Sequence, residues 1–165
     1  MRRAALLVSV LVTAACFGPG SSLTPGGRGI PEIAIAFPES SPPGSVQTAV
    51  LTVTNPGPQD MGAVVVAFAR VGPGPESNGL PATIVDGGAK HKNPDVVAVH
   101  PAPENVSLAA IEFTFDRLSE GDTREIEFDL RVPVTVGEAA NSVTVYDGAD
   151  PDRVAGIRLS TIVEP

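Results

Sequence analysis

Eight consecutive residues in the second half of the chain alternate strictly between polar and apolar side chains. They read Glu-Ile-Glu-Phe-Asp-Leu-Arg-Val and cover residues 125–132. Successive side chains of a β-strand point to opposite faces of its sheet, so this alternation predicts a strand with one buried face and one solvent face. The chain therefore has to fold around a sheet that covers a core on one side.

The same pattern recurs elsewhere, and clusters of glycine and proline separate the runs. Further strands are predicted at residues 33–37, 49–54, 64–68, 96–99, 111–116, 143–145 and 157–161. Residues 64–68 are apolar on both faces, which is typical of a central strand. About eight short strands with turns between them predict an all-β fold for residues 30–165, an immunoglobulin-like antiparallel β-sandwich. The 165 residues suffice for one such domain, and no internal repeat is visible.

The longest stretch without a strand pattern runs from Gly72 to Asp95. It is too rich in glycine and proline for a stable helix, although Ala82-Thr83-Ile84-Val85 would suit a short edge strand. Long loops on a rigid sandwich often carry binding surfaces. A binding loop and an unstructured loop are therefore equally supported interpretations of this segment.

The N-terminus has the organisation of an export signal. Two arginines follow Met1, and residues 4–12 are apolar. The apolar run through Phe17 would span roughly 21 Å as a helix, which is shorter than the hydrocarbon core of a bilayer at about 30 Å. This length predicts a signal peptide at residues 1–15 rather than a membrane span.

The only cysteine of the chain, Cys16, follows directly after Thr13-Ala14-Ala15. This segment resembles the lipobox of bacterial lipoproteins, although the first position usually holds leucine. The resemblance implies that Cys16 receives a diacylglycerol and becomes the first residue of the mature chain. Two acyl chains hold a protein stably on a membrane, whereas one does not. The alternative is a plain secretory signal cut after Ala15, which would leave a free thiol.

Residues 16–29 would join that lipidated cysteine to the domain. The segment is built mainly of glycine, proline and serine, which makes it a flexible linker with a reach of about 20 Å.

The charge of the chain limits its partners. The formal net charge is −8, and removal of Arg2 and Arg3 with the signal leaves 9 basic against 19 acidic side chains. An acidic surface repels phosphate backbones and anionic head groups, so we expect no nucleic-acid partner. A single cysteine also excludes an intrachain disulfide.

Two segments carry a further resemblance. Residues 50–58 read Val-Leu-Thr-Val-Thr-Asn-Pro-Gly-Pro, and residues 118–128 read Leu-Ser-Glu-Gly-Asp-Thr-Arg-Glu-Ile-Glu-Phe. These segments, with residues 131–133 and 141–145, resemble the bacterial conserved-repeat domains (domain of unknown function eleven). The resemblance implies an immunoglobulin-like fold in surface proteins, without catalytic residues. This chain has one copy, where many members have tandem arrays, and a long insert between Val71 and Val96.

No catalytic pattern stands out, so we predict that the chain is not an enzyme. Nucleophilic catalysis needs a base beside the nucleophile, and His91 and His100 are the only histidines. The carboxylates of the alternating strands fall on their solvent faces, where they are usually solvated surface groups. They are Glu112, Asp116, Glu125, Glu127 and Asp129.

A cation site is a second possibility, although no cofactor is required. Asp147, Asp150 and Asp152 lie in one bent turn, and Ca²⁺ takes oxygen ligands of this kind. A hydrophilic hairpin turn is the favoured reading of the same residues. A transition-metal set is a weaker alternative, because its members lack a fixed spacing. That set consists of Asp86, His91, Asp95 and His100.

Two functions follow from these observations. The favoured one is a membrane-anchored extracytoplasmic lipoprotein, in the periplasm or on the cell surface. It would display a non-enzymatic interaction domain that binds a protein partner through the long loop or an edge strand. The alternative is a Ca²⁺-dependent ligand-binding lipoprotein that uses the turn at Asp147, Asp150 and Asp152.

Overall fold

The computed structural model describes residues 29–69, 79–81, 95–107 and 111–165. These residues form ten strands and no helix. The strands are β1 (Glu32–Ala36), β2 (Ser40–Ser41), β3 (Val46–Thr54), β4 (Val64–Phe68), β5 (Val96–His100), β6 (Asn105–Ser107), β7 (Glu112–Phe115), β8 (Thr123–Arg131), β9 (Gly137–Asp147) and β10 (Asp150–Val163). Accordingly, no helix in the described part of the chain has the length and hydropathy to cross a membrane.

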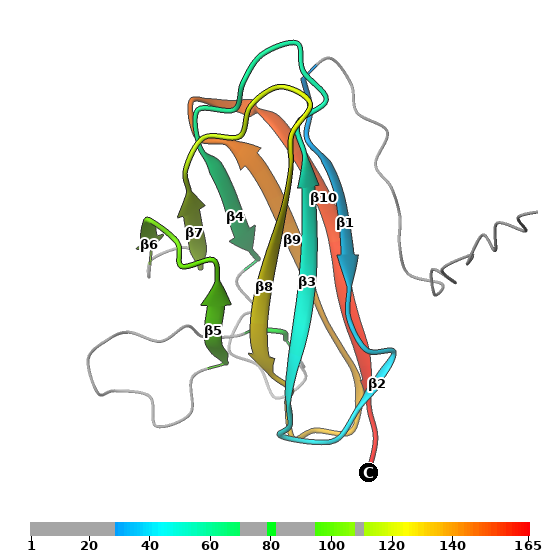
Figure 1. Ribbon diagram of the computed structural model, residues 1–165. Coiled ribbons are helices and arrows are strands. Elements are labelled where there is room, and N and C mark those ends of the chain that lie inside the picture. Colours follow the sequence, from blue (N-terminus) through cyan, green and yellow to red (C-terminus); the bar gives the residue numbers. More distant parts are fainter. Residues whose placement is uncertain (1–28, 70–78, 82–94, 108–110) are drawn as a thin grey trace, which may run out of the picture.

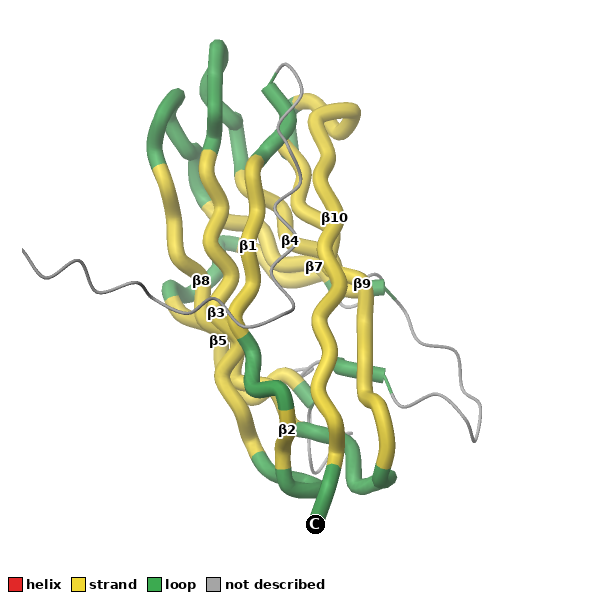
Figure 2. The backbone as a smooth tube through the Cα atoms, turned by 90° about the vertical axis from the view of Figure 1, so that its right-hand side faces the viewer, coloured by secondary structure: helices red, strands yellow, loops and turns green. Residues whose placement is uncertain are grey.

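The strands form two sheets that pack face to face (Figures 1 and 2). One sheet has the order β1-β3-β8-β5, and the other has the order β2-β10-β9-β4-β7-β6. The first order corresponds to the A-B-E-D sheet of an immunoglobulin domain, and β10-β9-β4 corresponds to its G-F-C sheet. The fold is therefore the predicted all-β, immunoglobulin-like sandwich.

The first two strands of the chain belong to different sheets. β1 pairs antiparallel with β3 in the first sheet, whereas β2 pairs parallel with β10 in the second sheet. The chain thus changes sheets between Ala36 and Ser40. The buried hydroxyls of Ser41 and Thr161 lie 2.9 Å apart and hydrogen-bond across the short parallel pair.

The predicted alternation decides which side chains fill the core. Ile126, Phe128, Leu130 and Val132 are all buried, as the sequence predicts. Phe128 contacts Phe68 and Phe113 edge-on, with ring centroids 5.2 and 5.3 Å away. This aromatic cluster joins the two sheets, because Phe128 lies on β8 and its two partners lie on β4 and β7.

The structure adds two strands to the predicted eight and lengthens several others, most of all β9 and β10. β2 has two residues and β6 has three, so neither shows a period in the sequence. β9 and β10 extend beyond their apolar alternation because polar side chains occupy inward positions. Asn141 and Asp147 on β9 and Arg153 on β10 are buried, each with hydrogen-bond partners.

Truncation of Phe128 tests the aromatic cluster. The residue is fully buried, so Phe128→Ala should lower the free energy of unfolding by about 3–5 kcal/mol. Glu127→Ala is the matched control on the solvent face of the same strand and should change stability by less than about 0.5 kcal/mol. Urea unfolding followed by circular dichroism measures both. Equal effects of the two substitutions would contradict the assigned strand faces.

Candidate functional site

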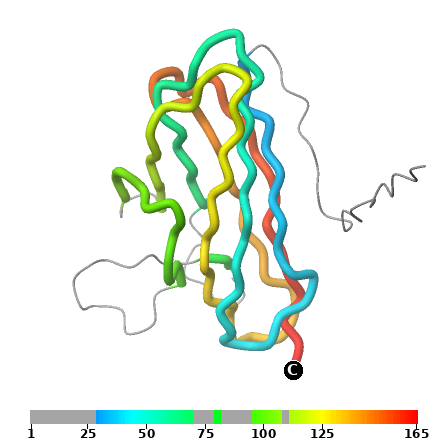
Figure 3. The backbone as a smooth tube through the Cα atoms, viewed as in Figure 1, coloured from blue at the N-terminus to red at the C-terminus, as the bar shows by residue number. Residues whose placement is uncertain are grey.

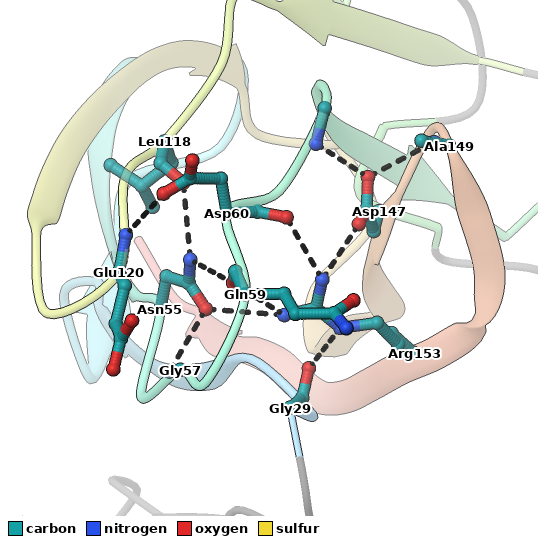
Figure 4. A network of polar contacts seen from close by, with 11 residues as sticks. Gly29, Asn55, Gly57, Gln59, Asp60, Leu118, Glu120, Asp147, Ala149 and Arg153 are labelled. Atoms are coloured by element: carbon teal, nitrogen blue, oxygen red, sulfur yellow. Dashed lines mark hydrogen bonds and ion pairs between the residues drawn. The ribbon is translucent and has the colours of Figure 1, made fainter.

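The connections β3–β4, β7–β8 and β9–β10 meet at one end of the sandwich (Figure 1). We call this end, formed by residues 55–63, 116–122 and 147–150, the loop end. Besides the buried apolar Met61 and Leu118, its interior holds buried polar side chains (Figure 4). Buried polar groups are costly unless they are paired, so their contacts define how these loops are held.

Arg153 of β10 is the centre of this polar network. Its guanidinium has five N–H groups, and each has an acceptor. Nε donates to the carbonyl of Gly29 at 2.5 Å. Nη1 donates to the carbonyl of Asp60 and to the carboxylate of Asp147, while Nη2 donates to the side-chain oxygen of Asn55 and the carbonyl of Gln59. The side chain therefore has no donor left for an external anion.

Asp147, the last residue of β9, forms a buried ion pair with Arg153. Its Oδ2 accepts from Nη1 at 2.9 Å, and the two side chains are only 2% and 10% exposed. The other oxygen, Oδ1, accepts from the backbone N–H groups of Gly62 and Ala149, both at 2.9 Å. The carboxylate is thereby fully paired, and it joins the β3–β4 connection to the β9–β10 hairpin.

Asn55 connects a third loop to the same network. Its amide nitrogen donates to the carbonyls of Gln59 and Leu118, and its oxygen accepts from Gly57 N–H as well as from Arg153. One fully buried side chain thus closes its own turn and fixes the β7–β8 connection. The sequence predicts the turn after β3, but it does not reveal the inward orientation of Asn55.

Asp60 lies at the exposed rim of the network. It pairs with Arg117, and its carboxylate accepts from the backbone N–H of Glu120 at 2.8 Å. The hydrogen bond from the Glu120 amide lowers the pKa of Asp60. Desolvation opposes this effect, and the smaller contributions of Arg117 lower the pKa further. The ionised carboxylate therefore bridges the β3–β4 and β7–β8 connections at neutral pH.

Gly29 holds the incoming chain against the sandwich. Its φ of 74° lies in the left-handed region, where side chains are rarely tolerated. A Cβ atom at this position would lie 2.9 Å from Arg153 Nε, so a side chain would also displace the guanidinium. The network consequently fixes the point at which the chain enters the domain.

The three carboxylates of the expected calcium site are not brought together. Asp147 is buried and paired with Arg153, whereas Asp150 and Asp152 are exposed on the hairpin. No group of three His, Cys, Asp or Glu side chains in the described segments is placed to hold a metal ion. Asp147 is oriented toward Arg153, which supplies the cation that a buried carboxylate needs. Calcium binding itself stays a prediction.

Other predicted positions lie outside the described residues. These are Cys16, Asp86, His91 and most of the 72–95 loop, of which residues 79–81 and 95 are described. His100 is exposed at the end of β5. The backbone carbonyl of Asp95 accepts from the N–H of Arg131 at 2.6 Å, so this residue is attached to β8.

The sequence did contain a signal for Arg153. Counting back by two from Val163, the inward positions of β10 pass through Thr161, Leu159, Ile157 and Ala155 and reach Arg153. An arginine at an inward register position requires a buried acceptor. That acceptor, Asp147, lies six residues earlier on the partner strand of the same hairpin.

A second polar pair lies on the outer face of the larger sheet. The hydroxyl of Tyr146 donates to Glu112 at 3.3 Å, from β9 across β4 to β7. Burial of the phenol and the negative charge of Glu112 both raise the pKa of Tyr146. Both effects disfavour the phenolate.

The comparisons with known proteins concern structure rather than sequence. No family model matches the chain and no curated protein matches it, so the resemblance to the conserved-repeat family is unconfirmed. One similar solved structure is the CARDB domain of a Pyrococcus furiosus protein, determined in complex with di-metal ions. It shares 14% identity over 84% of this chain and 99% of that chain, with a TM-score of 0.45.

Another similar structure is an ASH, or PapD-like, domain of human CEP192. It shares 14% identity over 98% of both chains, with a TM-score of 0.41. Neither likeness assigns a function to this chain.

Removal of the guanidinium tests the network. Arg153→Met keeps the aliphatic stem but leaves the buried Asp147 carboxylate without its cation, so we expect a loss of about 3–5 kcal/mol in unfolding free energy. Arg158→Met is the matched control on the same strand. Its ion pair with Glu138 is exposed, so we expect a loss below about 1 kcal/mol. Denaturant unfolding compares the two variants, and similar losses would contradict the central role of Arg153.

Titration of the tyrosine tests the contact with Glu112. Tyr146 is the sole tyrosine and the chain has no tryptophan, so absorbance at the tyrosinate wavelength reports this group alone. We expect its pKa to lie above the usual value of 10.0 and to fall toward it in Glu112→Gln, because that change removes the opposing charge. Glu138→Gln, on the same strand as Tyr146, is the control and should leave the titration unchanged. An unshifted pKa in the unmodified protein would disprove the interaction.

Proposed function

We propose that this chain is a lipoprotein anchored on the extracytoplasmic side of the cell membrane, in the periplasm or on the cell surface. Its immunoglobulin-like sandwich would serve as a non-enzymatic domain that binds a protein partner. The observation that carries the proposal is the position of the only cysteine. Cys16 follows a basic start, an apolar segment and Thr13-Ala14-Ala15, and it precedes the glycine- and proline-rich tether.

The contacts of Gly29 support a role as a tethered body. The anchor would lie about 13 residues before Gly29, and Arg153 binds the carbonyl of Gly29. The buried hydrogen bond between Arg153 and Gly29 would therefore keep movement of the tether from disrupting the pairing of β1. A domain built in this way is suited to display surfaces near a membrane.

The chemistry of the described polar groups supports a non-enzymatic role. The buried Arg153 and Asp147 direct all their hydrogen bonds to the protein itself. The acidic side chains of β8 alternate outward along a strand instead of converging on a cavity. The acidic balance of the whole chain favours a protein partner over nucleic acid.

Substitution of the cysteine tests the anchor. In Cys16→Ser we expect no incorporation of labelled fatty acid and a shift of the protein from the detergent phase to the aqueous phase on phase separation, because the acyl chains have no attachment atom. The control Cys16→Ser/Ser21→Cys keeps one cysteine but moves it into the tether, and it should also remain unlabelled. Mass spectrometry of the exported protein identifies the modified residue. An unmodified Cys16 thiol on exported protein would refute the proposal.

A further inference from the structure

The two ends of the sandwich lie at different distances from the proposed anchor. The chain enters at the loop end, where Arg153 binds Gly29, and β1 then runs toward the opposite end (Figure 3). This step rests on the proposed function: with Cys16 in the membrane, the loop end lies nearest the bilayer. The tether has a mean reach of about 20 Å, whereas β10 alone is roughly 46 Å long at about 3.3 Å per residue. The opposite end is therefore the part of the domain held farthest from the membrane.

That far end exposes apolar side chains. It consists of the β2–β3 connection and the β8–β9 connection, which lie side by side (Figure 1). We call residues 42–46 and 133–137 the valine tip. Val134 and Val136 are 77% and 62% exposed, and Val46 beside them is 44% exposed. Two neighbouring prolines, Pro42 and Pro43, are exposed as well.

The backbone of the valine tip is held in place. Gly44 N–H donates to the carbonyl of Pro133 at 3.3 Å, and Val132 N–H donates to the carbonyl of Ser45 at 2.8 Å. Within the first connection, the N–H and the hydroxyl of Ser45 both donate to the carbonyl of Pro42. The β2–β3 turn is therefore hydrogen-bonded to the start of the β8–β9 connection, which carries the exposed valines. Association with such a pre-ordered surface loses less conformational entropy than association with a loose loop.

The charges around the valine tip select among possible partners. Glu39 and Glu164 are exposed beside β2 and the end of β10, and the described residues contain no lysine. Arg131, two residues before Pro133 of the tip, donates from Nη1 to the carbonyl of Gly44 at 3.4 Å. The exposed Arg158 of β10 pairs with Glu138, next to Gly137 of the tip. An anionic bilayer and a second copy of this acidic chain would both meet like charge here. A protein surface with an apolar centre and a basic rim would meet opposite charge.

We propose that the valine tip docks an extracytoplasmic protein whose binding surface has an apolar centre ringed by lysine or arginine. Val134 and Val136 supply the apolar contact, and Glu39 and Glu164 supply the complementary rim. Burial of apolar side chains at the centre of an interface gives most of the affinity, whereas rim charges mainly set the association rate and the salt dependence.

The first part of the test locates the contact on the membrane-bound protein. A photo-reactive amino acid replaces Val134 or Val136 in the full-length chain, in the cells that produce it, and Val106 on edge strand β6 is the matched control position. We expect a discrete cross-linked protein from positions 134 and 136 but not from position 106. Cross-links to lipid, to a second copy of the chain, or from position 106 alone would overturn the proposal, as would no cross-link at all.

The second part measures affinity, because a cross-linked protein alone does not support the proposal. The purified cross-linked protein is titrated with full-length lipoprotein in detergent micelles. Val134→Asp/Val136→Asp should weaken binding at least 10-fold, and Glu39→Lys/Glu164→Lys should weaken it several-fold and reduce its salt dependence. Val106→Asp should leave binding unchanged. An affinity unchanged by the two valine substitutions, at an unchanged melting temperature, would overturn the proposal.

The two proposals fail in different ways. An unmodified Cys16 refutes the lipoprotein, whatever the valine tip contacts. A lipidated Cys16 with no protein bound at the tip refutes only the docking surface.

Discussion

The ion pair between Arg153 and Asp147 is the constraint on which the loop end depends. Taking a guanidinium out of water is costly unless its N–H groups find acceptors, because each unpaired donor retains its desolvation cost. Here the acceptors come from the chain before β1, the β3–β4 connection and the end of β9. These loops have to converge on one side chain, and this requirement gives them a single arrangement.

Arg153 also fixes the start of the described chain against the sandwich. Because Arg153 binds Gly29, the incoming chain is fixed beside the hairpin of the two longest strands, β9 and β10. These strands extend the domain away from that point, and β2 pairs with β10 near its far end. The sandwich thus has a buried polar contact at one end and an exposed apolar surface at the other.

Exposed apolar residues on turns that are held by hydrogen bonds form a fixed surface, whereas those on mobile segments do not. Val134 and Val136 lie in the chain between two buried core residues, Val132 and Ala139, while their own side chains face solvent. Their exposure is therefore a property of the fold, and it has to be either tolerated or used. The exposed acidic side chains of Glu39 and Glu164 disfavour association with like-charged surfaces.

Period-two alternation within a segment is local information, so the sequence alone predicted the sandwich, the central position of β4, the buried face of β8 and the turn after Thr54. The order of residue types along the first 29 positions also predicted a lipidated Cys16 and a tether, which lie outside the described residues. The partners of Arg153 lie up to 124 residues away, and those of β2 about 120 residues away, so only the tertiary structure decided them. It alone also separated Asp147 from Asp150 and Asp152 and brought residues 42–46 beside 133–137. Alternation states which side of a strand is buried, whereas the atoms met there depend on how distant strands pack.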